Sequence, residues 1–154
     1  RKESSAASDV YKRQADDISY KQRFSKQVNY FQESKYDFCV TRAESMQIKK
    51  VIPKYSFYLP ARMVSSFKNP FIHGTLMIRR EVLLEIGSYN ERFYYAQDFR
   101  LFKDLLTKKK KFKHIKEPLY SLNMKNNISS LKKTEQKYYS DLVIKNKTPL
   151  NLIR

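Results

Sequence analysis

The chain contains only two glycines, Gly74 and Gly87, and this scarcity excludes the common phosphate-binding loops. A dinucleotide-binding loop needs three closely spaced glycines, and a P-loop needs two glycines at a fixed distance before a lysine. Neither pattern can be written anywhere in this sequence. A nucleotide, if one binds, must therefore be held by another arrangement.

The metal-binding residue types are also few. The single Cys39 excludes an intrachain disulfide and a cysteine-cluster zinc site. His73 and His114 are the only histidines, which leaves no histidine-rich site. If a metal binds, carboxylates hold it, and this favours a hard cation such as Mg²⁺ or Mn²⁺.

The composition indicates one globular domain. The chain has 154 residues, of which 41% are hydrophobic and 14% aromatic, so it can bury a moderate core. No run of about 18 apolar residues could cross a membrane, and no signal-peptide core stands near the start. We therefore expect a cytoplasmic protein.

The net charge of +17 has three interpretations. The basic residues are spread along the chain, with Lys108 to Lys111 as the only run, and this favours a solvated basic surface in a compositionally biased sequence. The other two are a surface that faces anionic lipid or an anionic donor, and a surface that binds nucleic acid. We favour the first interpretation and expect no nucleic-acid partner.

The first fourteen residues differ in character from the rest of the chain. Residues 1–14 show no apolar periodicity and resemble translated sequencing-adapter read-through, so we exclude them from the fold. We expect native sequence to begin near Ala15, with one folded segment over residues 15–130 and a helical tail over 131–154.

Patterning predicts alternating helices and strands. Ser19 and Gln22 form a capping-box pattern before a helix that runs to about Ser34, with Phe24, Val28 and Phe31 on one face. Strands are expected at residues 36–40, 71–78, 111–115 and 119–122, with mostly loop over 44–68.

Three further helices complete the pattern. Residues 80–86 form a short helix that Gly87 ends, and a second helix starts near Gln97. A third, at about 131–144, should bury Tyr138, Leu142 and Val143. The inner face of the second helix comprises Leu101, Phe102, Leu105 and Leu106. Strands that alternate with helices predict an α/β fold.

Two adjacent carboxylates stand immediately before the first predicted helix. Asp16 and Asp17 repel each other unless a cation or hydrogen bonds compensate, and a divalent ion bridging them to a diphosphate would do so. The alternative is an acidic helix start that suits the helix dipole, which spacing alone favours.

Other candidates also have a structural alternative. Asp98, at the head of a predicted helix, is either a general base or an N-cap. His73 is either a catalyst or a satisfied structural histidine within a strand. Arg79 and Arg80 either face an anionic ligand or lie at a solvated strand end.

The order of five segments resembles that of family-2 glycosyltransferases, over about residues 15–130. Ala15 to Ser19 resembles the segment with the metal-binding aspartates, and 69–80 resembles the acceptor-side strand. Residues 86–91 are similar to the glycine-aromatic turn, and 95–101 to the segment with the catalytic base. The closing strand and loop are matched by 117–120 and 127–129.

The resemblance implies the C-terminal, acceptor-side part of a GT-A nucleotide-diphospho-sugar transferase fold, an α/β fold with a mixed sheet and flanking helices. Asp16 and Asp17 would bind Mn²⁺ or Mg²⁺ and the donor diphosphate. Asp98 would be the base of an inverting transfer to a hydroxyl acceptor. The residues expected at donor or acceptor are His73, Arg79, Gln97 and Lys125.

The resemblance also implies the partners and the setting. These are a nucleotide-diphosphate sugar and a glycan or lipid-linked acceptor, in surface polysaccharide or lipopolysaccharide synthesis. Any membrane contact would be peripheral, on the inner face, through basic surface.

The sequence departs from the family pattern in several places. Gln14 stands where many relatives have the first aspartate of the motif, and Gln97 where they often have glutamate. Asn123 and Lys125 replace an arginine and a histidine. The family's front half has no counterpart here, so we expect weak donor binding and little turnover by this chain.

Two rival hypotheses remain. The first is a basic single-stranded nucleic-acid-binding module, in which tyrosines and phenylalanines stack on bases while lysines follow the phosphates. Against it, the aromatic residues fall at predicted core-facing positions. The second is a folded remnant without activity.

Overall fold

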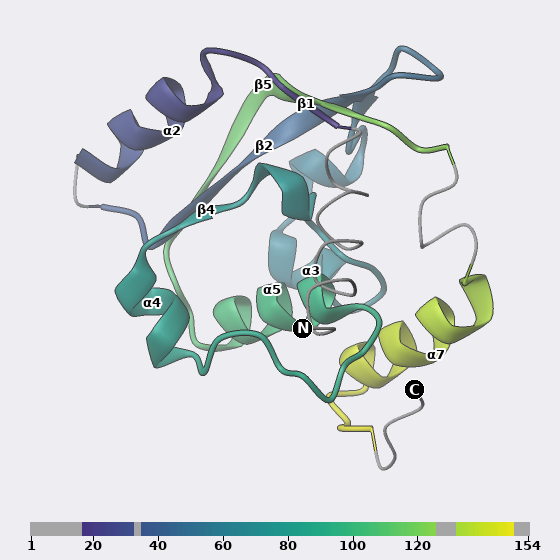
Figure 1. Ribbon diagram of the computed structural model, residues 1–154. Coiled ribbons are helices and arrows are strands. Elements are labelled where there is room, and N and C mark those ends of the chain that lie inside the picture. Colours follow the sequence, from purple (N-terminus) through teal and green to yellow (C-terminus); the bar gives the residue numbers. More distant parts are fainter. Residues whose placement is uncertain (1–16, 33–34, 126–131, 150–154) are drawn as a thin grey trace, which may run out of the picture.

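The computed structural model describes residues 17–32, 35–125 and 132–149 of the chain (Figure 1). Its helices and strands alternate along these ranges. The longer helices are α2 (Arg23–Gln32), α4 (Arg80–Glu85), α5 (Gln97–Thr107) and α7 (Lys133–Ile144). The short helical turns are η1 (Ser56–Tyr58), α3 (Ala61–Val64) and η2 (His73–Thr75). The strands are β1 (Ile18–Ser19), β2 (Phe38–Ser45), β3 (Val51–Ile52), β4 (Met77–Ile78) and β5 (Phe112–Leu122).

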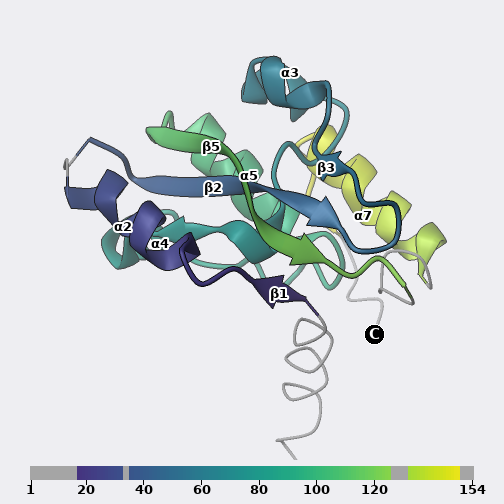
Figure 2. The ribbon, with the colours of Figure 1, turned by 90° about the horizontal axis from the view of Figure 1, so that it is seen from above.

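The five strands form one mixed sheet in the order β1-β5-β2-β3, and β4 pairs with β2. β2 and β5 are parallel, whereas the other pairings are antiparallel. A parallel pair needs a long crossover connection, and the chain between β2 and β5 supplies it with α3, α4 and α5 (Figures 1 and 2). The expected α/β class, with a mixed sheet and flanking helices, is confirmed.

β2 is covered on both faces. Phe38 and Val40 pack into a cluster with the apolar side of α5, whereas Cys39 lies against Gln27 of α2 on the other face. A strand buried on both sides reads as continuously apolar rather than alternating. The predicted strand over 36–40 is therefore found, but it starts at Phe38 and continues to Ser45.

β5 joins two strands that the sequence predicts separately. Pro118 pairs with Arg42, and the register of the β2–β5 ladder shifts on either side of Arg42. Proline has no N–H to donate, so it fits a strand where the ladder is irregular. The strand thus passes Pro118 without ending, and Tyr120 stays in register beside β1.

The predicted helix around residues 97–107 is confirmed together with its inner face. The buried residues of α5 include Leu101, Phe102, Leu105 and Leu106, which share a cluster with Phe38. The predicted short helix is also found as α4, and Gly87 follows it with φ 90°. Glycine adopts positive φ without the steric cost that other residues meet.

The apolar face predicted for α2 is wrong. Phe24 is 56% exposed and Val28 43%, whereas Arg23 and Gln27 are buried against the sheet side of the helix. Gln27 donates a hydrogen bond to the Thr75 carbonyl oxygen at 2.8 Å, so this helix docks through polar side chains. Hydrophobic periodicity cannot detect a helix that packs in this way.

The capping box is likewise not formed. Ser19 lies in β1, and its hydroxyl accepts a hydrogen bond from the guanidinium Nε of Arg23 at 2.8 Å. The helix starts at Arg23, whose backbone N–H bonds the Tyr20 carbonyl oxygen. The hydroxyl therefore orients an arginine rather than capping the helix.

Two other predictions need correction. Residues 71–78 form a 3₁₀ turn, η2, followed by the two-residue strand β4, and not one strand. In α7 the buried aromatic residue is Tyr139, while Tyr138 is 45% exposed. Tyr139 and Val143 pack with Phe93 and Phe99, which joins α7 to the start of α5. None of the described helices is long and apolar enough to cross a membrane.

Candidate active site

Asp17 is held by hydrogen bonds beside the C-terminal end of β5. Its Oδ1 accepts a hydrogen bond from the backbone N–H of Asn123 at 2.7 Å, and its Oδ2 accepts one from the Tyr120 hydroxyl at 2.8 Å. The antiparallel pairing of β1 with β5 places Asp17 beside the residue that follows β5. The carboxylate therefore ends the ladder and is held in one orientation.

Tyr120 links this carboxylate to the η2 turn. Its ring lies against Gly74, and a β-carbon built on Gly74 would be 2.5 Å from the Tyr120 hydroxyl oxygen. Burial raises the pKa of Tyr120, and the hydrogen bond to Asp17 and the charge of Asp17 raise it further. Tyr120 is therefore a neutral hydrogen-bond donor at physiological pH.

Arg23 braces the same turn from α2. Its Nη1 donates a hydrogen bond to the Gly74 carbonyl oxygen at 2.6 Å, and its guanidinium carbon lies 5.3 Å from the centre of the Tyr120 ring. Burial lowers the pKa of Arg23, but a guanidinium stays charged in proteins. A buried cation thus lies over the ring of Tyr120, whose hydroxyl holds the Asp17 carboxylate.

A second group of polar side chains begins at His73, which precedes Gly74 in η2. The imidazole Nε2 of His73 is hydrogen-bonded to the Tyr89 hydroxyl at 2.7 Å, and the two rings meet edge to face. Burial lowers the pKa of His73, and the negative charge of Asp98 partly opposes this shift. Burial also raises the pKa of Tyr89, and the charge of Asp98 adds to that rise. Asp98 therefore lies near both side chains.

Asp98 is positioned by a side chain and not by helix capping. Its Oδ2 accepts a hydrogen bond from Nδ2 of Asn69 at 2.9 Å, and Oδ1 of Asn69 in turn accepts one from the Phe71 N–H. The N-cap position of α5 is Ala96, which has φ 57° and makes no side-chain cap. The N-cap interpretation of Asp98 is therefore wrong.

The backbone before Asp98 is strained. A non-glycine residue in the left-handed region costs on the order of 1 kcal/mol and is typical of sites where a side chain must be aimed. Ala96, at φ 57°, is buried and packs with Phe93 and Phe99, which hold it in place. This turn sets the direction in which α5 starts and so where Asp98 lies.

The two groups meet at consecutive residues of η2. Gly74 contacts Arg23 and Tyr120, and Tyr120 carries the connection to Asp17. His73 contacts Tyr89 and responds to the charge of Asp98. The sequence-predicted residues Asp17, His73 and Asp98 are thus brought to one region, although 81 positions separate Asp17 from Asp98.

Among the described residues, Asp17 is the carboxylate that the group around Tyr120 offers to a divalent cation. No cluster of three potential ligands occurs among the residues that the structure describes, and Asp16 lies outside them. Mg²⁺ is commonly bound by one or two carboxylates together with substrate phosphates and water. Each oxygen of Asp17 accepts one hydrogen bond from the described part of the chain, and a carboxylate oxygen has a second lone pair. Asp17 therefore fits such an ion as one oxygen ligand.

The other residues predicted to contact donor or acceptor are Lys125, Gln97 and Arg79, and they lie in three different parts of the fold. Lys125 is in the exposed loop that follows β5, where its N–H bonds Oδ1 of Asn123. Gln97 is the first residue of α5, beside Asp98. Arg79 instead donates hydrogen bonds to the carbonyl oxygens of Tyr36 and Phe31, and its predicted ligand role stays a prediction.

The sequence missed the residues that hold the carboxylates. Asn69, Tyr89 and Tyr120 fall within segments that carry the family resemblance, but no role was assigned to them. Arg23 lies in the first predicted helix, where the resemblance gives it no role in the site. Side chains that meet across a fold leave no periodic signal, and the one available signal was the scarcity of glycine, which marks Gly74 as a position of close approach.

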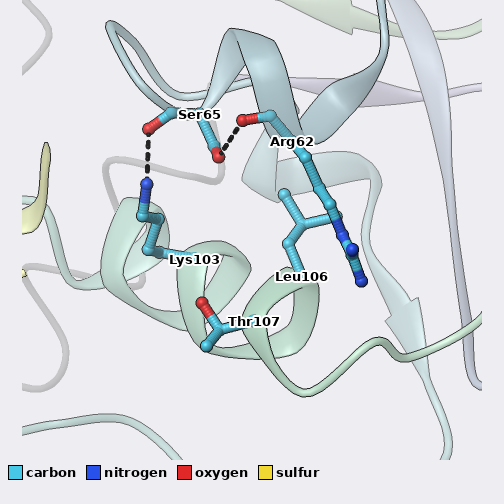
Figure 3. A pocket seen from close by; sticks show the side chains of 5 residues that line it. All are labelled: Arg62, Ser65, Lys103, Leu106 and Thr107. Carbon is cyan, nitrogen blue, oxygen red and sulfur yellow. Dashed lines mark hydrogen bonds between the residues drawn. The ribbon is translucent and has the colours of Figure 1, made fainter.

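A hollow of about 190 Å³ lies elsewhere, between α3 and α5. Figure 3 shows Lys103 of α5 reaching the backbone carbonyl of Ser65, with Leu106 beside Arg62. None of the residues that line it belongs to the groups around Asp17 and Asp98.

No protein-family model and no curated protein sequence matches this chain. The functional assignment is therefore argued from the residues and their geometry.

Proposed function

We propose that the chain is the acceptor-side part of an inverting GT-A glycosyltransferase that uses a nucleotide-diphosphate sugar. The sequence resemblance supplies the family, and surface polysaccharide or lipopolysaccharide synthesis is the setting that it implies. The observation that carries the proposal is that the η2 turn links two carboxylates. Gly74 contacts Tyr120, which is bonded to Asp17, and the pKa of His73 responds to the charge of Asp98.

Asp98 has the role of general base. The acceptor hydroxyl attacks the anomeric carbon of the donor sugar while its proton passes to Asp98, and the bond from that carbon to the diphosphate breaks. A base placed in this way contributes about 10² to 10⁴ in rate. Asn69 orients the carboxylate of Asp98 through Oδ2, and we assign the acceptor proton to Oδ1.

His73 and Tyr89 orient the acceptor side of this site. Burial keeps the imidazole neutral and Tyr89 protonated at physiological pH, so the pair can donate and accept hydrogen bonds without adding charge. Gln97 lies one residue from the base and contributes a polar amide at the same end of α5.

Asp17 anchors the donor side. A Mn²⁺ or Mg²⁺ ion bound there supplies Lewis-acid stabilisation of the departing diphosphate. Lys125, on the loop tied to Asn123, provides a positive charge near the same carboxylate.

A thermal melt with Mn²⁺ and a panel of nucleoside diphosphates tests the proposal. A ligand present at ten times its dissociation constant stabilises the native state by about 1.4 kcal/mol, which is a rise of about 4 °C for a chain of this size. We expect this rise for a metal–nucleotide pair but not for either component alone. Asp17→Asn should abolish it, whereas the matched control Asp141→Asn, an exposed carboxylate on α7, should retain it.

Two results would count against the proposal. The first is a rise that Asp17→Asn and Asp141→Asn preserve equally. The second is a rise with oligo-dT alone that salt removes, which would favour the nucleic-acid hypothesis.

A further inference from the structure

A second exposed surface lies away from the candidate active site, on the segment that projects with α3 (Figure 2). Large apolar side chains are unusually exposed there, with Tyr55 at 75%, Tyr58 at 68% and Phe67 at 54%. Leu59 and Met63, between them in the sequence, are also exposed. A concentration of exposed apolar side chains marks an interaction site.

The charges around these side chains have a single sign. No aspartate or glutamate occurs between Glu44 and Glu81, whereas Lys54, Arg62 and Lys68 lie within the same segment. The Lys54 ammonium lies 4.7 Å from the centre of the Tyr55 ring, so charge and aromatic surface adjoin. We call these three basic residues, together with the five exposed apolar ones, the aromatic–basic face.

The hollow between α3 and α5 adds a place for an anion. It contains two cationic side chains, Arg62 and Lys103, the hydroxyl of Thr107, and no carboxylate (Figure 3). Lys103 already donates to the Ser65 carbonyl oxygen at 3.1 Å, which holds its ammonium in the hollow. In Figure 3 the Arg62 guanidinium points away from the Lys103 ammonium, so a phosphate ester would meet Arg62 at the rim of the hollow.

We propose that the aromatic–basic face docks on an anionic lipid bilayer, with a lipid phosphate at Arg62 on the rim of the hollow. Tyrosine suits the headgroup region, because its ring is apolar and its hydroxyl is polar. Leu59, Met63 and Phe67 enter the acyl boundary, as the apolar side of an interfacial segment does. Lysine and arginine near the surface add electrostatic attraction to anionic lipid.

The composition of the face favours a bilayer over nucleic acid. Stacking on bases uses aromatic rings and cations, but it gives no role to exposed Leu59 and Met63. A hydrocarbon boundary stabilises both aliphatic and aromatic side chains. The inference does not depend on the proposed sugar transfer, since it involves none of the residues around Asp17 or Asp98.

A fluorescent side chain tests the site of contact. The chain has no tryptophan, so Tyr58→Trp introduces a single reporter into the face, and Phe24→Trp introduces one at a similarly exposed position on α2. With vesicles of phosphatidylcholine and phosphatidylglycerol, we expect emission from Tyr58→Trp to shift to shorter wavelength and to be quenched by brominated acyl chains. Phe24→Trp should show neither change, and vesicles of phosphatidylcholine alone should leave both variants unchanged.

Co-sedimentation with the same vesicles tests the energetics. Tyr58→Ser with Leu59→Ser and Phe67→Ser should weaken binding at least about tenfold. The matched triple on α2 and α4, Phe24→Ser with Val28→Ser and Leu84→Ser, should bind as the unaltered chain does. All six positions are exposed, so both triples should fold, which circular dichroism checks.

The charges are tested in the same way. Lys54→Gln with Arg62→Gln and Lys68→Gln should weaken binding about tenfold or more. The control Lys109→Gln with Lys111→Gln and Lys116→Gln removes equal charge at exposed positions elsewhere, and it should have a smaller effect. Equal losses in both triples would overturn the proposal, because attraction would then come from net charge alone. It would also be overturned by quenching of Phe24→Trp, or by an equal shift of Tyr58→Trp with oligo-dT.

Discussion

The Tyr120 hydroxyl oxygen lies where a side chain on residue 74 would have to be, 2.5 Å from a β-carbon built on Gly74. The same hydroxyl donates a hydrogen bond to Asp17. Because Gly74 has no side chain, Tyr120 of β5 can pack against the η2 turn and hold the carboxylate of Asp17. The glycine is needed for space, since no positive φ is involved at this position.

Gly74→Ala should destabilise the fold by about 1 to 3 kcal/mol, the usual cost of overpacking. Tyr120 is buried and bonded to Asp17, and its Cζ would also be only 2.7 Å from the new β-carbon, so the ring cannot simply move aside. Chemical denaturation measures the change in the free energy of unfolding.

A double-mutant cycle with Tyr120→Phe separates this cause from others. Gly74→Ala and Tyr120→Phe should be energetically coupled. Gly87→Ala is the control: it meets nothing within 4 Å but has φ 90°, so it should cost about 1 kcal/mol through the backbone alone. It should show no coupling to Tyr120. Unaltered stability of Gly74→Ala would contradict the contact.

Asp17→Asn should lower the pKa of Tyr120. Burial is the largest cause of the raised value, and the hydrogen bond and charge of Asp17 contribute the rest. The pKa should therefore fall but stay above the ordinary value of tyrosine. Ultraviolet titration of the variant, compared with the variant that also carries Tyr120→Phe, isolates this group. Glu44→Gln, a carboxylate on β2 bonded to Tyr20, should leave Tyr120 unaffected.

Asp98→Asn should lower the pKa of His73 below its value in the unaltered chain. The carboxylate raises that pKa against the larger effect of burial, so its removal leaves burial unopposed. Two-dimensional NMR resolves the signals, since the chain has only two histidines. The control Asp104→Asn removes a carboxylate that pairs with Arg100 on the same helix. If it shifts His73 equally, or if Asp98→Asn raises the pKa, the assigned proximity is wrong.

The fold should lose stability on mild acidification because of His114. Burial, with a smaller effect of the Arg42 charge, lowers the pKa of His114 from 6.5 to about 4. Its Nε2 is buried and unpaired among the described residues, and the ring contacts Phe57 and Phe71. Between these two values the unfolded chain binds the proton and the folded chain does not, so stability falls as pH falls.

The loss between pH 7 and pH 5 should be about 2 kcal/mol from this group. Urea unfolding at the two pH values measures it. His114→Phe keeps an aromatic ring against Phe57 and Phe71 and removes the titrating nitrogen, so it should be less sensitive to acid than the unaltered chain by that amount. Equal sensitivity would show that His114 is not buried in its neutral form.

Sequence patterns predicted the parts of the fold in which local preference and burial agree. The helix over 97–107 carries a continuous apolar face, and Gly87 ends the preceding helix at positive φ. The patterns failed at α2, where Arg23 and Gln27 are the buried residues. The hydrogen bonds that compensate for burying these polar groups are accepted by backbone carbonyls of η2, far along the chain.

In the candidate site, too, some residues could be predicted from the sequence and others could not. Asp17, His73 and Asp98 could be proposed from residue type and order, because each has a chemical property that a sequence displays. The residues that position them could not, since Tyr120, Asn69 and Arg23 act through contacts made only in the folded chain. Pro118 likewise suggested two strands, because sequence alone does not show that a bulge accommodates it.

Paramagnetic broadening by Mn²⁺ in the presence of a nucleoside diphosphate tests the central claim most directly, because it locates the ion on the chain. We predict that the amide signal of Asn123 and the ring signals of Tyr120 broaden first, that broadening requires the nucleotide, and that Asp17→Asn removes it. Broadening that starts instead at exposed carboxylates such as Asp141 or Glu91, or that is unchanged by Asp17→Asn, would contradict a donor site at Asp17.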